Sequence, residues 1–165
     1  MQWFSTPQQF IEYARAYLVA AIEVCGRMVA LESQRTWPNG SVASMLAAHS
    51  VELFLKGMIL HRAQRYELKS HDIDILIADF DKLYPEESFR TEFPFKTVYL
   101  GPTSVDEPSP KNGDSTPSML YRYPVAKNKA PWSAFCGLDP LDFMAFLEKW
   151  QKDSEALVAL AAKAG

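Results

Sequence analysis

The stretch of the chain at residues 47–76 places acidic, basic and imidazole side chains inside and just after an apolar run. Glu52 and Lys56 stand four residues apart, the spacing of neighbours on one helical face, so we expect them to form an ion pair. His49 precedes Glu52 by about one helical turn and is expected on the same face. Because the run is otherwise apolar, these side chains form either a structural network or a polar site.

The sequence YRYP, at residues 121–124, offers Glu52 a further partner from another element. A buried carboxylate needs more than one partner, so we expect a partly buried ion pair between Glu52 and Arg122. Lys56 is then expected to extend outward to solvent along its flexible stem. An arginine beside a tyrosine suits the phosphate and the base of a nucleotide. The candidate ligand-binding residues are therefore His49, Glu52, Lys56, Arg122 and Tyr123, with His71 beside them in a small polar cleft.

The elements that position these residues follow from apolar periodicity. From Thr6 or Pro7 onward, apolar side chains recur at three- and four-residue spacings and predict a long first helix. Pro38, Asn39 and Gly40 are expected to break the chain. A second helix should then begin with Ser41 as its N-cap and continue to about residue 64. It is apolar on nearly every side, which is typical of a helix surrounded by others.

Two further helices are predicted. The third covers HDIDILIADFDKLYP, with Ser70 as its N-cap, and ends before Pro85. The last begins with Asp139 as N-cap and Pro140 at its first position. Between them, residues 94–118 are rich in proline and are expected to form an exposed insertion, with a short strand at KTVYL, followed by an extended stretch. The fold class is therefore all-α, an up-and-down bundle of four main helices in a single domain spanning residues 1–165.

Composition limits the class of protein. With 48% hydrophobic and 22% charged residues, the chain is expected to be globular with a substantial core. A net charge of -3 argues against a general nucleic-acid or membrane binder, because such proteins carry a basic excess. Neither a signal peptide nor a long uncharged apolar window is evident, so a cytoplasmic location without membrane contact is expected. Cys25 and Cys136 are isolated and predict buried thiols, with no metal site, disulfide or cofactor.

Four motifs in order resemble the HEPN family, named for higher eukaryotes and prokaryotes nucleotide-binding domains. In the branch of that family that the chain most resembles, helix two carries a Glu followed by a Leu-Lys pair, helix three opens with a Lys-Thr-His-Asp-Leu pattern, and Arg-Tyr-Pro precedes the last helix. The matching residues here are Glu52, Leu55 with Lys56, the run 69–73 and the run 122–124. The resemblance implies a helical bundle that is commonly a homodimer. It also implies a binding or accessory role around nucleotides or RNA, in toxin–antitoxin or defence systems, with a nucleotidyltransferase-type partner. The insertion at about 94–118 departs from the family pattern.

The resemblance also carries an alternative, a metal-independent endoribonuclease. Many ribonuclease members of the family have an Arg, four to six residues, and then a His, and Arg65 and His71 have five residues between them. His71 would activate the ribose 2′-hydroxyl and Arg65 would stabilise the charge on the phosphate, which makes them candidate catalytic residues. Tyr66 departs from the Asn, Asp or His that follows the Arg in the nuclease pattern. The competing interpretation places His71 in the first turn of a helix, packed or hydrogen-bonded to a neighbour, and makes Arg65 a solvated linker residue.

A homodimer is expected on physical grounds too. Trp3, Phe4 and Trp150 near the ends of the chain, together with an apolar first helix, predict more apolar surface than a monomer usually exposes.

Overall fold

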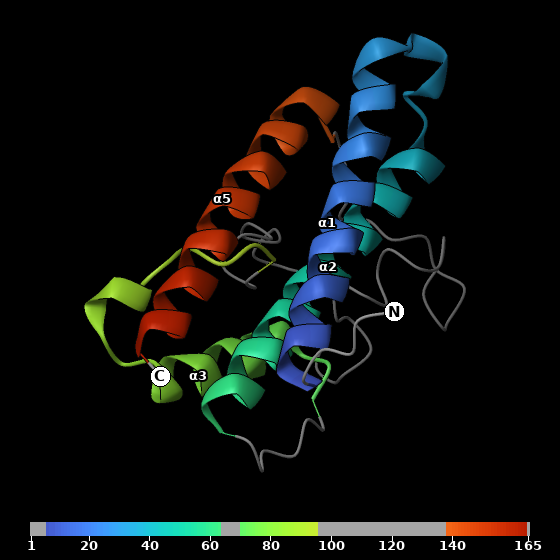
Figure 1. Ribbon diagram of the computed structural model, residues 1–165. Coiled ribbons are helices and arrows are strands. Elements are labelled where there is room, and N and C mark those ends of the chain that lie inside the picture. The colour runs from blue at the N-terminus through green and yellow to red at the C-terminus, as the bar shows by residue number, and fades with distance from the viewer. Residues whose placement is uncertain (1–5, 64–69, 96–137, 165) are drawn as a thin grey trace, which may run out of the picture.

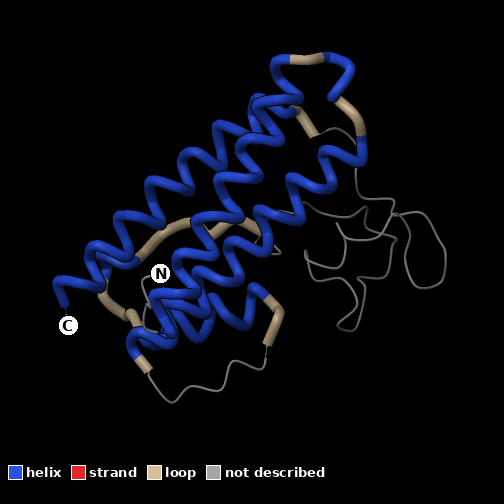
Figure 2. The backbone as a smooth tube through the Cα atoms, turned by 45° about the vertical axis from the view of Figure 1, so that its right-hand side comes forward, coloured by secondary structure: helices blue, strands red, loops and turns tan. Residues whose placement is uncertain are grey.

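The computed structural model describes residues 6–63, 70–95 and 138–164, and these residues form an all-α helical bundle (Figure 1). Its four helices are α1 (Thr6–Ala30), α2 (Trp37–Arg62), α3 (Ile73–Leu83) and α5 (Pro140–Ala164). Two short 3₁₀ turns, η1 (Glu32–Gln34) and η2 (Glu87–Phe89), follow α1 and α3. Figure 2 shows only helix and loop in this part of the chain, and the predicted fold class is confirmed. The strand expected at KTVYL, and most of the insertion and the extended stretch after it, lie outside the described residues.

The three long helices pack along one another and the short α3 closes one end (Figure 1). α1 runs in the opposite direction to α2, and α5 runs in the same direction as α2. α1 packs against both α2 and α5, whereas α3 packs mainly against α2 and lies beside its last turns. This arrangement surrounds α2 with neighbours, as its apolar sequence predicts.

The first helix buries the face that its periodicity predicts. The buried side chains of α1 recur at three- and four-residue spacings and comprise Ala14, Leu18, Ala21, Val24, Cys25 and Met28. Burial raises the pKa of the Cys25 thiol to about 11, so the thiol is held in its neutral form. The expectation that Cys25 is buried is confirmed, while Cys136 lies outside the described residues.

The second helix starts earlier than the sequence suggests. Thr36, not Ser41, is its N-cap, and the Thr36 side chain accepts a hydrogen bond from the backbone N–H of Asn39. Pro38 and Gly40 therefore lie inside the first turn, so their interpretation as helix breakers was wrong. Proline is tolerated there because the first backbone N–H groups of a helix have no partner within the helix. The helix ends at Arg62, two residues before the predicted end.

α2 is the core helix of the bundle. Residues on all its sides are buried in its second half, including Val51, Phe54, Leu55, Met58 and Ile59, although Val42 near its start is exposed. In the described part of the chain, α2 alone is long and apolar enough to cross a membrane, but 72% of its most apolar window is buried inside the protein. The core helix of a helical bundle has the same length and apolar composition.

Aromatic rings pack together where α2, α3 and α5 meet. Tyr84, at the end of α3, donates its hydroxyl proton to the carbonyl oxygen of Met58 at 2.9 Å. Phe93 contacts both Phe80 and Trp150 through ring centroids 5.1 and 5.4 Å apart. Trp150 is 2% exposed, so the expectation that it contributes to an exposed apolar surface was wrong. Its position in the middle of α5, facing α2, explains the burial.

The last helix begins as predicted. Asp139 accepts hydrogen bonds from the backbone N–H groups of Leu141 and Asp142 at 2.8 and 3.1 Å, and Pro140 occupies the first position. This local cap is encoded by adjacent residues, and its chemistry does not depend on tertiary packing.

Candidate functional site

The centre of the candidate site is an ion pair buried on α2. Lys56 Nζ lies 2.7 Å from Glu52 Oε1, and the two side chains are only 6% and 4% exposed. The expected pairing is present, but Lys56 does not extend to solvent, so that part of the prediction was wrong. Neighbours surround α2 on all sides at this level, and the shortest way to compensate a buried ammonium is the carboxylate one turn earlier.

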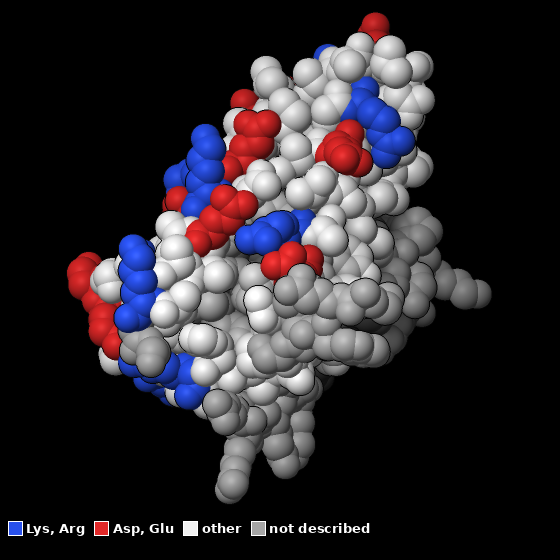
Figure 3. Space-filling view, viewed as in Figure 1, with Lys and Arg blue, Asp and Glu red and all other residues white. Residues whose placement is uncertain are grey.

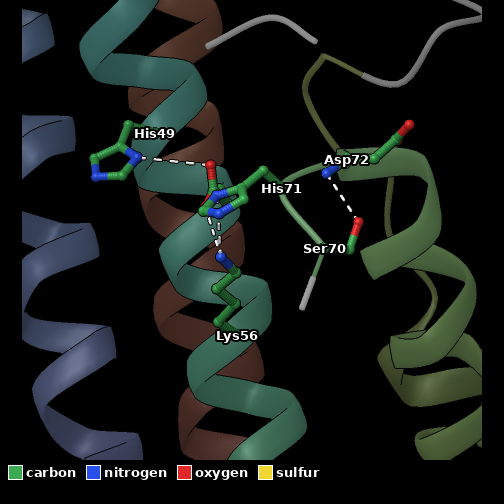
Figure 4. Close-up of polar contacts among 6 residues, drawn as sticks. His49, Lys56, Ser70, His71 and Asp72 are labelled. Atoms are coloured by element: carbon green, nitrogen blue, oxygen red, sulfur yellow. Dashed lines mark hydrogen bonds and ion pairs between the residues drawn. The ribbon is translucent and has the colours of Figure 1, made fainter. Parts of the chain in front are cut away.

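His71 approaches the same carboxylate from the segment before α3. Its Nδ1 lies 2.9 Å from Glu52 Oε1, although the two residues are 19 positions apart in the chain. The His71 side chain is 72% exposed, so only one edge of the ring faces the protein. Figure 4 shows the imidazole of His71 in front of α2, between His49 and Lys56. All three side chains contact the carboxylate of Glu52.

The start of α3 fixes the backbone on which His71 stands. The N-cap of α3 is Asp72, whose Oδ1 accepts a hydrogen bond from the N–H of Asp74 at 2.9 Å. The Ser70 hydroxyl accepts from the N–H of Asp72 at 3.0 Å (Figure 4). The prediction of Ser70 as the N-cap was therefore wrong by two residues, and His71 lies just before the helix rather than in its first turn. These two side-chain hydrogen bonds fix the backbone of this short segment, and the contact of His71 with Glu52 joins it to α2.

The contacts determine which nitrogen of His71 carries a proton. An ionised carboxylate only accepts hydrogen bonds, so Nδ1, at 2.9 Å from Glu52, is the protonated nitrogen. Lys56 Nζ also lies 3.5 Å from His71 Nδ1, but both nitrogens donate to the same oxygen of Glu52 and neither accepts from the other. When the ring is neutral, Nε2 therefore keeps its lone pair, on a side chain that is mostly exposed to solvent.

The carboxyl group of Glu52 is ionised at all ordinary pH values. Burial raises its pKa, but the polar contacts with His49, Lys56 and His71 and the charge of Lys56 lower it by more, to about 2. At the centre of the site, the negative charge of Glu52 is therefore compensated by the positive charge of Lys56.

His49 completes the group at the opposite oxygen. Its Nδ1 lies 3.7 Å from Glu52 Oε2, which is an ion pair only when the imidazole is protonated. Its ring packs edge-on against the ring of Tyr17 on α1, with centroids 4.7 Å apart. We call His49, Glu52, Lys56 and His71 the Glu52 cluster. Sequence reasoning missed Tyr17 because it reads as an ordinary apolar position of α1.

The structure brings together some of the predicted site residues. His49, Glu52, Lys56 and His71 meet, as the expected polar cleft requires. Arg65, Arg122 and Tyr123 lie outside the described residues, and with them the expected pair of Glu52 and Arg122. His71 is the second partner that Glu52 requires. The sequence analysis expected His71 in the cleft and in the catalytic pair, but it did not predict a contact with this carboxylate.

Two properties of the described surface limit the chemistry of the site. Among the described residues, no group of three His, Cys, Asp or Glu side chains is arranged to hold a metal ion. Figure 3 shows Lys and Arg mixed with Asp and Glu on the visible face. Exposed residues of opposite charge also pair, as Lys149 Nζ does with Asp153 Oδ2 at 2.7 Å. The described residues of that face form no extended basic stripe of the kind that binds long nucleic acids through their backbone.

Comparisons of the chain with protein-family models, with curated proteins and with solved structures gave no match.

Proposed function

We propose that this protein is a HEPN-type binding or accessory module that contacts a phosphate group of a nucleotide or RNA at the Glu52 cluster. The observation that carries the proposal is the contact of 2.9 Å between Glu52 Oε1 and His71 Nδ1, because it fixes an exposed imidazole on a buried support. The resemblance in the motifs around Glu52 and His71 supplies the class of ligand.

The charges of the cluster favour an anion. Glu52 and Lys56 compensate each other, so protonation of His71 or His49 gives the cluster a net positive charge. When His71 is protonated, its Nδ1–H faces the Glu52 carboxylate and its Nε2–H is free to donate to a phosphate oxygen. The ligand would therefore be held through one exposed donor on a rigid support, which suits a single phosphate better than a long backbone.

The assembly that we propose follows the same resemblance. The module acts as a homodimer, in the cytoplasm and without a membrane, beside a nucleotidyltransferase-type partner of a toxin–antitoxin or defence system. No cofactor is part of the proposal. The net charge of -3 supports contact with a nucleotide or a short RNA segment over binding of a long nucleic acid.

The test is a calorimetric titration of the purified chain with a nucleoside monophosphate and with a short single-stranded RNA. We expect binding that weakens about tenfold or more in His71→Ala, because a hydrogen bond to a charged group is lost. His61→Ala is the matched control, since His61 is an exposed imidazole in the last turn of α2 and outside the cluster. Equal weakening in both variants, or no binding by the unmodified chain, contradicts the proposal.

The exposure of His71 favours a second candidate, the metal-independent ribonuclease. A neutral His71 with its proton on Nδ1 presents Nε2 as a base, and Glu52 stabilises the imidazolium that forms when Nε2 takes a proton from a 2′-hydroxyl. Arg65 would supply the cation. Incubation with labelled RNA in EDTA separates the two functions. We expect no strong cleavage of generic single-stranded RNA, whereas cleavage that disappears in His71→Ala would favour the ribonuclease.

A further inference from the structure

A buried polar group lies on the side of α2 that faces away from the Glu52 cluster. The indole N–H of Trp150 on α5 is buried and has no hydrogen-bond acceptor among the described residues. Trp150 is 2% exposed, and its ring packs against Phe54 and Phe93. A buried donor without an acceptor is rare in folded proteins, so this N–H requires a partner.

A small cavity adjoins Trp150 where α1, α2 and α5 meet. Its volume is about 20 Å³, and its lining combines apolar side chains with Arg15, Ser50, Gln151, Ser154 and Glu155. A cavity needs about 10–15 Å³ to hold one water molecule, so this cavity has room for one.

Ser50 supplies the acceptor that such a water needs. The Ser50 side chain is buried, and its hydroxyl donates its only proton to the carbonyl oxygen of Ala14 at 2.7 Å. A hydroxyl oxygen has two lone pairs, and these stay available to a donor from the cavity. Arg15 and Glu155, an exposed pair 4.0 Å apart, also line the cavity and provide a polar side toward solvent.

We propose that this cavity is a hydration site, in which one buried water accepts the indole N–H of Trp150 and donates to Ser50 Oγ. The water thereby joins α5 to α2, and through the bond from Ser50 to Ala14 also to α1. It satisfies the donor at the point where the three long helices meet, and it belongs to the fold rather than to the Glu52 cluster.

Nuclear magnetic resonance of the ¹⁵N-labelled full chain tests the proposal at the indole N–H. The chain has four tryptophans, so Trp150→Phe identifies the signal by its loss. We expect a Trp150 indole proton shifted downfield, as hydrogen bonding requires, and a cross-relaxation peak from it to a long-lived water. Trp37, which is exposed, is the control and should show rapid exchange with solvent instead.

Each other outcome overturns the proposal. An upfield indole proton without a water contact means that the N–H is unpaired, and a downfield proton without a water contact means that a protein atom accepts it. A serine hydroxyl that exchanges with solvent would imitate a water, so the measurement is repeated in Ser154→Ala. The contact should persist there, and its loss would assign it to the Ser154 hydroxyl.

Discussion

Nδ1 of His71 lies 2.9 Å from Oε1 of Glu52, which joins an exposed imidazole to a carboxylate that is 4% exposed. The same oxygen accepts a hydrogen bond from Lys56 at 2.7 Å. A buried charge is tolerated only when it is paired, so the ion pair on α2 and the position of His71 depend on each other. Variants at Glu52 and Lys56 therefore test the stability of the cluster, and variants at His71 test its chemistry.

The first prediction concerns the buried ion pair. Glu52→Gln leaves the ammonium of Lys56 buried without a counter-charge, and we expect it to lower the free energy of unfolding by about 3 kcal/mol. Combining it with Lys56→Met removes both charges and should recover part of that loss. Urea melts of both single variants and the double variant measure the coupling. Glu155→Gln is the control, because this side chain is 51% exposed and its loss should cost no more than about 0.5 kcal/mol. Strictly additive losses would mean that the pair contributes nothing as a pair.

The second prediction concerns the loss of folding stability at acidic pH. The pKa of Glu52 is lowered in the folded protein from 4.5 to about 2, so the folded state favours the ionised form. This contribution to stability is fully present above pH 4.5 and is lost as the pH falls towards 2. It amounts to about 3 kcal/mol at one pKa unit per 1.36 kcal/mol. Urea melts across this range should show a smaller decline with acid in Glu52→Gln than in the unmodified chain. Parallel declines would show that Glu52 is not the group that titrates.

The third prediction uses two helical glycines as a matched pair. A Cβ added at Gly57 would lie 2.8 Å from Cδ1 of Ile11 and 3.1 Å from Cβ of Phe10, so α1 and α2 would have to move apart. We expect Gly57→Ala to destabilise the protein by about 1–3 kcal/mol. A Cβ at Gly26 would meet only Sδ of Met144 at 3.9 Å, so Gly26→Ala should raise the stability by up to about 1 kcal/mol. Thermal melts of the two variants that shift in the same direction would contradict this packing.

The fourth prediction is the homodimer. Trp150 is buried and no longer supports it, but Tyr13, Leu31, Trp37 and Leu141 are large apolar side chains exposed on the described surface. Light scattering at micromolar concentration should give twice the monomer mass of 18.7 kDa. A single species at the monomer mass would exclude a stable dimer under those conditions.

The sequence predicts the helices better than it predicts their contacts. The predicted start of α5 is correct because Asp139 and Pro140 form a local cap. The predicted start of α2 is wrong because proline can either end a helix or occupy its first turn. Here Pro38 lies in the first turn because Thr36 caps the helix. Residues His49, Glu52 and Lys56 were expected on one face because helical spacing alone places them there. The contact between His71 and Glu52 could not be predicted in this way, because it arises only when α3 packs against α2.

The most direct test of the account is the ¹⁵N spectrum of the histidine imidazoles. It is recorded without ligand in mildly alkaline solution, where the rings are neutral, and with and without a nucleoside monophosphate in mildly acidic solution, where they are protonated. The chain has three histidines, so His49→Ala and His61→Ala suffice to identify His71. We predict that neutral His71 carries its proton on Nδ1, and that the nucleotide changes the Nε2 signal of His71 more than either nitrogen of His61. A proton on Nε2, or a His71 signal that does not respond to the nucleotide, would contradict the assignment of the Glu52 cluster as the binding site.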